Sequence, residues 1–143
     1  MRLNSLTTEL YGPDQRVSRM LQDRGMSQKE ISILRRRLPQ FSVSASKAIL
    51  DCVYRLYPED PRADRFVVIL RDRYGLDGEP IKTLQQIGED LSISRERVRQ
   101  LQVKLVGKLR RGPSRKVIED ALYAAARQQI RKAVMEHRAA HTA

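Results

Sequence analysis

The 143-residue sequence lacks several features that mark secreted, metal-binding and membrane proteins. Its single cysteine, Cys52, excludes an internal disulfide and a cysteine-based zinc site, and it fits a reducing cytosol. The longest β-like apolar run, 66–70, is far shorter than the roughly 18 residues of a transmembrane helix. The N-terminus carries no apolar segment of the kind found in secretory signals. We therefore expect a cytoplasmic protein that makes no membrane contact.

Glycine and aromatic residues are also scarce. Seven glycines, with neither a GxxxxGK[ST] nor a GxGxxG pattern, argue against a phosphate-cradling loop. With no Trp and two Phe, the core must be mostly aliphatic. The sequence shows no catalytic triad, carboxylate constellation or metal-ligand cluster, and we interpret His137 and His141 as solvated tail residues. We therefore expect no enzyme, no cofactor and no metal.

Positive charge is what the sequence has in excess. Lys and Arg number 28 against 17 Asp and Glu, which gives a net charge of +11. Much of the excess lies in 95–116, which contains nine basic residues and a single acid, Glu96. A basic excess of this kind is typical of proteins that bind nucleic acid or an anionic membrane surface, and of the two we expect nucleic acid.

Helical periodicity dominates the chain, so the expected fold class is all-α. Ser27 and Thr83 begin capping boxes, and Pro39 is expected to stop a helix before it. The helices are expected at 14–24, 28–38, 44–57, 62–74, 83–91, 95–110 and 114–138. We divide the chain into a small helical module (1–60), a helix-turn-helix domain (61–116), and a long C-terminal helix with its tail (117–143).

Residues 84–110 have the pattern of a helix-turn-helix. A short helix with Gly88 at its middle is followed by a turn at Ile93 and then by a longer basic helix. On a helical wheel the apolar stripe of the second helix consists of Val98, Leu101, Leu105 and Leu109. The opposite face carries Glu96, Arg99, Gln100 and Val103. Arg pairs with guanine, Gln with adenine and Glu with the cytosine amino group, so this mixed set favours sequence reading over a purely electrostatic contact.

Three segments, 71–78, 82–88 and 94–101, closely resemble region 4 of the bacterial sigma-70 family, and 108–110 and 113–115 resemble its C-terminal end. The resemblance covers about 62–120. It implies binding to the promoter −35 element on double-stranded DNA and docking on the β-flap of the RNA polymerase core. It also implies a cytoplasmic location at the bacterial nucleoid. The DNA-binding candidates are Arg95, Glu96, Arg97, Arg99, Gln100, Lys104 and Lys108.

The sequence departs from the family at several points. Ser92 stands where the family commonly has Gly in the turn, and the helix after Pro113 runs beyond the family's usual end. Residues 1–60 do not resemble the region 2 that melts promoters, so this chain alone is not expected to melt one. A split-sigma subunit, a sigma-like regulator and a decoy of the housekeeping sigma remain open. The alternative class is an adaptor or inhibitor that occupies the β-flap without reading DNA.

Residues 1–60 are expected to be a separate module that binds a sigma-like or regulatory protein. A fragment that starts near Arg62 should then fold and keep most of the DNA affinity. Two features of the module leave other interpretations open. The helix dipole explains the cluster Arg35–Arg37, but the cluster could also contact DNA or polymerase. The stretch Gly25–Ile31 weakly resembles part of a second helix-turn-helix.

Overall fold

The computed structural model describes residues 6 and 17–142, and in this range the chain forms seven helices and no strand. They are α2 (Val17–Asp23), α3 (Gln28–Arg36), α4 (Leu38–Leu56), α5 (Ala63–Tyr74), α6 (Leu84–Leu91), α7 (Arg95–Leu109) and α8 (Gly112–Thr142). The all-α prediction is therefore confirmed. The first residues of the helix expected at 14–24, up to residue 16, lie outside the described residues. None of the described helices is long and apolar enough to span a membrane.

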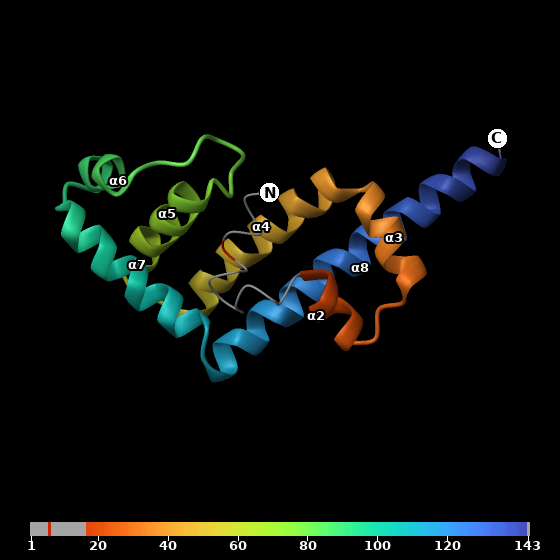
Figure 1. Cartoon of the computed structure of the whole chain (residues 1–143), viewed down its shortest axis with the longest axis horizontal. Coiled ribbons are helices and arrows are strands. Elements are labelled where there is room, and N and C mark those ends of the chain that lie inside the picture. The colour runs from red at the N-terminus through yellow and green to blue at the C-terminus, as the bar shows by residue number, and fades with distance from the viewer. Residues whose placement is uncertain (1–5, 7–16, 143) are drawn as a thin grey trace.

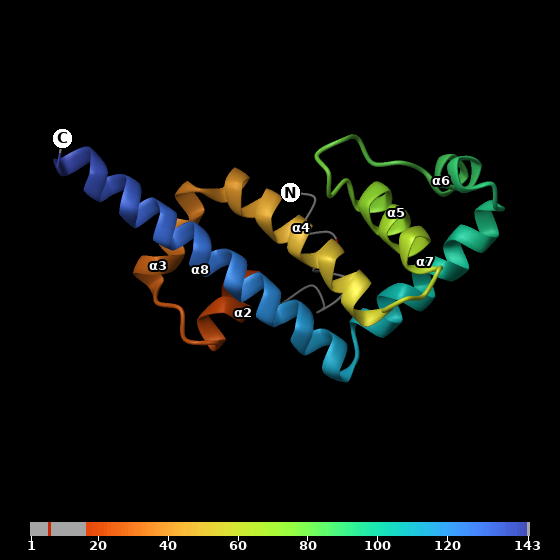
Figure 2. The same ribbon diagram turned by 180° about the vertical axis from the view of Figure 1, so that it is seen from behind.

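The helices form an elongated molecule with α4 and α8 lying side by side along its middle (Figures 1 and 2). Helices α5, α6 and α7 gather at one end. Away from them, α2 ends near the first half of α8, where Arg24 pairs with Asp120, and α3 lies farther along, where Glu30 pairs with Arg127. The C-terminal turns of α8 extend past α3. The N-terminus of α7 and the helix α3 are therefore at opposite ends of the protein.

One continuous core joins the two ends. Buried apolar side chains from Leu6 to Ile130 form a single cluster, which includes Ile49 of α4, Phe66 of α5 and Leu122 of α8. The contact between α4 and α8 is the most extensive of all the helix pairs. Residues 17–56 thus share their core with α8. The division of the chain at 60 and 116 remains a prediction about the functional roles of the three parts.

The junction between α3 and α4 differs from the expectation. The sequence predicted that Pro39 would stop a helix at Leu38 and that the next would begin at Ser44, but α3 ends at Arg36 and α4 already begins at Leu38. Pro39 lies in the first turn of α4, where its missing amide hydrogen breaks no helical hydrogen bond. Leu38, the last residue of the helix expected at 28–38, instead begins α4 and is 40% exposed.

The loop between α5 and α6 is fixed at both ends. Gly75 ends α5 with φ +64°, a left-handed conformation that favours glycine. The buried carboxylate of Asp72 accepts a hydrogen bond of 2.9 Å from Nε of Arg71, and it lies 3.7 Å from Nζ of Lys82. The Lys82 amide donates to the Asp72 carbonyl at 2.9 Å. These contacts hold the start of α6 against the end of α5.

Candidate nucleic-acid interface

Helices α6 and α7 meet in a three-residue turn. Ser92 ends α6 in the left-handed conformation (φ 57°, ψ 41°), and the Ile93 amide donates to the Gly88 carbonyl at 2.9 Å. Ser94 then caps α7, because its side-chain oxygen accepts a hydrogen bond of 3.0 Å from the Arg97 amide. An ideal Cβ on Gly88 would lie 2.7 Å from the Ile93 carbonyl oxygen, so the turn is packed too closely for a side chain there.

The first helix of the pair is held by a capping box. The Thr83 hydroxyl oxygen accepts from the Gln86 amide at 3.1 Å, and the Gln86 side chain accepts from the Thr83 amide at 2.9 Å. This box was predicted from the sequence and is confirmed. On the other side, the Gln102 side chain donates to the Tyr74 hydroxyl at 3.1 Å and links α7 to α5. Helix α7 is thus positioned by contacts with α5 and α6.

The predicted faces of α7 are confirmed. Val98, Leu101, Leu105 and Leu109 are all buried. The exposed side of the first turns carries Arg95, Glu96, Arg97, Arg99, Gln100 and Val103. Basic and amide groups that can read base edges therefore stand free of the core on the half of α7 that is farthest from α8 (Figure 1).

Two of these exposed residues form a pair that the sequence did not predict. The guanidinium of Arg99 donates to the Glu96 carboxylate through Nη2 at 2.6 Å and Nε at 2.9 Å. Hydrogen bonding from Arg99 lowers the pKa of Glu96, and the same contact raises the pKa of Arg99. Nη1 of Arg97 also donates to the Gln100 side chain at 3.3 Å. These pairs orient the outward groups before any ligand binds.

Lys104 and Lys108 lie farther along the helix. Lys108 is 13 residues after Arg95, about 20 Å along the axis at 1.5 Å per residue. Its ammonium stands 4.3 Å from the centre of the Tyr57 ring, which belongs to the segment after α4. Hydrogen bonds from Arg62 are the main cause that lowers the pKa of Asp60, and the positive charge of Lys104 adds to it. Both lysines therefore lie toward the 57–62 segment and away from the tip formed by Arg95 and Glu96.

A hollow beside the tip adds Arg73, which was not among the predicted DNA-binding residues. Arg73, Thr83, Leu84, Gln85 and Arg95 line it, so it lies where the N-termini of α6 and α7 approach each other. Nη1 of Arg73 donates to the Lys82 carbonyl at 3.2 Å. Two guanidinium groups and the N-terminus of a helix make this hollow suited to an anion. The position of Arg73, next to the end of α5, depends on the fold and could not be read from spacing alone.

The described part of the chain holds no group of three or more His, Cys, Asp or Glu side chains that could bind a metal. The rings of His137 and His141 lie 4.2 Å apart on the exposed last turns of α8. Cys52 is fully buried, and burial raises the pKa of its thiol.

The geometry of α6, the turn and α7 is that of a helix-turn-helix, a class of nucleic-acid-binding unit. Residues 63–111 match the family model for Sigma-70, region 4, and this part of the chain is a sigma region 4 domain. The comparison thus confirms the resemblance drawn from the three motifs.

Curated relatives match the same part of the protein. The chain is 37% identical over 62 residues to the RNA polymerase sigma factor SigA of Clostridium acetobutylicum, which covers 43% of this chain and 16% of that protein. It is 42% identical over 52 residues to SigA of Nostoc sp. strain PCC 7120, covering 36% and 13% respectively. It is 50% identical over 42 residues to SigA of Microcystis aeruginosa, which covers 29% of this chain and 10% of that protein. The match thus spans a sixth or less of these relatives' length. No solved structure matches the chain.

Proposed function

We propose that this protein is a transcription factor that reads a −35-like promoter element with α7 and docks on bacterial RNA polymerase. The observation that carries the proposal is the exposed set Glu96, Arg99 and Gln100 on the first turns of α7, within a region 4 domain. Residues at the start of a recognition helix are those that reach base edges in the major groove. The relatives are named RNA polymerase sigma factors, which supports the polymerase as the second partner.

The two halves of the interface have different roles in this proposal. The Arg99 guanidinium can form two hydrogen bonds with a guanine, and the Gln100 amide can form two with an adenine. Exposed Val103 can contact a thymine methyl. The hollow between Arg73 and Arg95 receives a backbone phosphate, because the first helix of a helix-turn-helix crosses the DNA backbone. Lys104 and Lys108 add positive charge along the flank without reading sequence.

The Glu96–Arg99 pair sets the position of the reading group. With Nε and Nη2, which form one edge of its guanidinium, on the carboxylate, Arg99 is oriented before DNA arrives. A base can accept from Nη1 of Arg99, which does not bond Glu96. A base that takes the Nε–Nη2 edge replaces Glu96, whose freed carboxylate can then accept from a cytosine amino group. Glu96 therefore acts as a positioning residue for Arg99 and as a candidate reader.

The test is a binding titration with a preferred −35-like duplex and a set of single base-pair variants of it. Arg99→Ala and Gln100→Ala should each lose ~1–3 kcal/mol on the preferred duplex and little on duplexes that already lack the matching base pair. Lys108→Ala is the matched control, because it should weaken binding to all the duplexes by a similar factor. Equal weakening of every duplex by Arg99→Ala would contradict base reading.

Docking is tested separately by capture on core RNA polymerase, with and without the housekeeping sigma. Retention on the core, together with displacement by that sigma, supports a shared site on the β-flap. Displacement without any sequence-dependent DNA binding would favour the alternative function, an adaptor or inhibitor that occupies the flap. Failure to bind the core would overturn the polymerase half of the proposal.

A further inference from the structure

The turn between α2 and α3 repeats the hydrogen-bond pattern of the turn between α6 and α7. The Met26 amide donates to the Leu21 carbonyl at 3.0 Å, five residues back, as Ile93 does to Gly88 at 2.9 Å. One residue earlier, the Gly25 amide donates to the Gln22 carbonyl, three residues back, as Ser92 does to Glu89. Gly25 and Ser92 both have positive φ, 100° and 57°. Residues 25–27 and 92–94 therefore share the same pattern of hydrogen bonds, although α2 ends one residue earlier before its turn than α6 does.

The cap that follows each turn is equivalent as well. Ser27 has φ −75° and ψ 161°, and Ser94 has φ −71° and ψ 154°. Each serine side chain accepts from the amide three residues on, at 3.1 Å from Glu30 and 3.0 Å from Arg97. Met26, in the middle of its turn, is 3% exposed and so packs into the core beneath the two helices.

The helices that leave the two caps have the same inner face. Ile31 and Leu34 are buried four and seven residues after Ser27, and Val98 and Leu101 are buried four and seven residues after Ser94. The same positions therefore point outward on α3 and on α7. The exposed residues of α3 are Gln28, Lys29, Ser32, Arg35 and Arg36.

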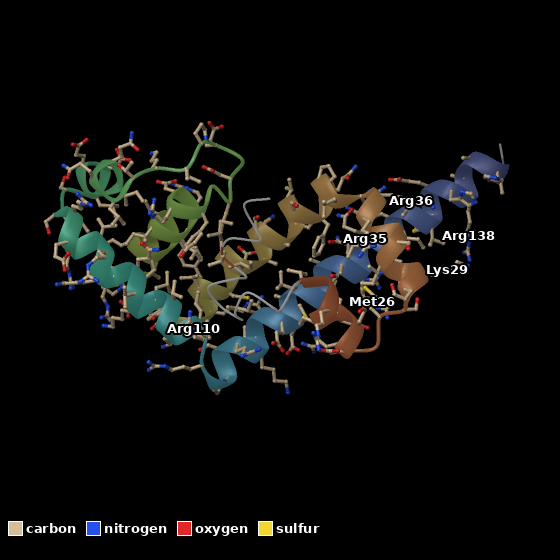
Figure 3. All side chains as sticks on the ribbon, viewed as in Figure 1. Met26, Lys29, Arg35, Arg36, Arg110 and Arg138 are labelled. Carbon is tan, nitrogen blue, oxygen red and sulfur yellow. The ribbon has the colours of Figure 1, made fainter. Side chains whose placement is uncertain are left out.

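This outer face of α3 is basic and is not neutralised by the rest of the molecule. Lys29, Arg35 and Arg36 form no ion pair with another residue of the described part of the chain. Glu30, the acidic residue of α3, does not neutralise these cations, because it caps its own helix and pairs with Arg127 of α8. Figure 3 shows the three cations on α3, with Arg138 of α8 near them at the same end of the molecule.

The α3 helix is mounted firmly on α8. Besides the Glu30–Arg127 pair, Arg37 pairs with Glu136 at 2.6 Å and donates to the Gln129 side chain at 3.2 Å. Gln129 is 3% exposed, and its side-chain nitrogen donates to the Ser44 hydroxyl at 3.0 Å. The face of α3 is thus presented by a fixed frame, as α7 is presented by α5 and α6.

We propose that α2 and α3 form a second helix-turn-helix, whose α3 contacts duplex DNA that flanks the element bound by α7. A second contact on duplex DNA fits the observations better than an acidic protein surface does. The cations stand on the outer face of a capped helix after a helix-turn-helix turn, and Gln28 and Ser32 between them can donate to phosphates or bases. The inference rests on the proposed function, because it takes DNA bound at α7 as its starting point.

The experiment compares two duplexes that carry the same −35-like element. One ends at the element, and the other extends it by about two helical turns, roughly 20 base pairs, on each side. The test variant is Lys29→Ala/Arg35→Ala/Arg36→Ala in the full chain. The matched control is Lys47→Ala/Arg55→Ala/Arg65→Ala, which removes the same charge from exposed positions on α4 and α5, outside the basic segment 95–116. Circular dichroism and melting confirm that both variants are folded.

The wild-type protein and the control should bind the long duplex more tightly than the short one, and the α3 variant should lose most of that gain. The loss of three phosphate contacts should also reduce the salt dependence of binding. Between 50 and 200 mM salt, the fall in affinity for the long duplex should be about 40-fold smaller for the α3 variant than for the wild type. On the short duplex all three proteins should bind alike.

Other results would overturn the inference. An α3 variant that gains as much from the flanking DNA as the wild type would show that α3 does not contact DNA. The same result, together with weaker capture on core polymerase, would assign α3 to a protein partner. A wild-type protein that binds neither duplex would instead contradict the proposed function, so the two failures are distinguishable.

Discussion

The carbonyl oxygen of Ile93, in the turn between α6 and α7, lies directly against the Cα of Gly88. A Cβ on Gly88 would be 2.7 Å from that oxygen and 3.4 Å from the Arg95 amide nitrogen, and both of these atoms belong to the backbone. Backbone cannot rotate away as a side chain can, so a methyl group here must move the start of α7.

Gly88→Ala should therefore destabilise the protein by ~1–3 kcal/mol and weaken binding to the −35-like duplex. Gly107→Ala is the matched control, because its Cβ would meet only the end of the Arg111 side chain, at 3.9 Å. Alanine in a helix interior is favoured over glycine, so this control should stabilise by ~0.5–1 kcal/mol. Urea unfolding measures both. A neutral Gly88→Ala would contradict the close packing of the turn.

Ser92→Gly should stabilise the protein. Ser92 has the left-handed backbone conformation, which costs a residue with a Cβ ~1–2 kcal/mol. Glycine removes that cost but makes the unfolded chain more flexible, so we expect a net gain of ~0.5–1 kcal/mol in the free energy of unfolding. The thermal melt of Ser92→Gly should lie above that of the wild type. Ser94→Ala, which loses a helix cap two residues later, should melt lower.

Acid should weaken the attachment of α3 to α8. The hydrogen bond from the Ser27 amide, followed by the contact with Arg127, holds the pKa of Glu30 below its ordinary 4.5. A carboxyl whose pKa is lower when folded contributes stability above the pKa of the unfolded chain and loses it as the pH falls through the folded value. Glu30→Gln should thus melt ~2–4 °C below the wild type at pH 7.

The melting difference for Glu30→Gln should narrow steadily below pH 4.5, because the wild-type carboxyl then becomes protonated. Glu89→Gln, on the exposed face of α6, should change the melting temperature little at either pH. A difference for Glu30→Gln that persists unchanged at pH 3 would show that shape, and not charge, accounts for the effect.

DNA binding should depend strongly on salt. If four to six of the nine basic residues in 95–116 contact phosphates, the logarithm of the binding constant should fall with the logarithm of salt concentration at a slope of ~−4 to −5. A titration between 50 and 300 mM salt gives the slope. A value near zero would exclude DNA as the ligand of this segment.

A fragment of residues 62–143 should not behave as the sequence suggested. Without α4, the face of α8 that carries Ile118, Leu122 and Ala126 would be exposed to water. We expect this fragment to self-associate in light scattering and to bind the −35-like duplex more than about tenfold worse than the full chain. A monomeric, helical fragment that keeps full affinity would restore the expectation of a separate N-terminal module.

The features that the sequence predicted correctly are local ones. Capping boxes at Ser27 and Thr83, and the apolar stripe of α7, follow from spacing within one helix or one turn. The predicted start of α4, at Ser44, was wrong because a proline is tolerated in the first turn of a helix as well as after its end. Motifs of the region 4 domain also point to the exposed face of α7 as a candidate DNA interface, since each candidate lies within 14 residues of the others, and the role of that face stays a prediction.

Contacts between distant segments could not be predicted in this way. The approach of Arg73 to Arg95, the cation on the Tyr57 ring and the packing of α4 on α8 all depend on tertiary structure. The α2–α3 turn is an intermediate case. Its residues gave only a faint pattern, and the equivalence with the α6–α7 turn appears when the hydrogen bonds of the two are compared.

The single core has a thermodynamic consequence for events at opposite ends of the chain. Because the cluster runs without interruption from Leu6 to Ile130, the protein should melt in one cooperative step. A ligand held by α7 at a hundred times its dissociation constant then adds about 2.7 kcal/mol to the free energy of unfolding of the whole molecule. Some peptide bonds in α2 and α3 can be cut by proteases only after the whole molecule unfolds. The ligand protects these bonds by the same free energy, although it never touches them.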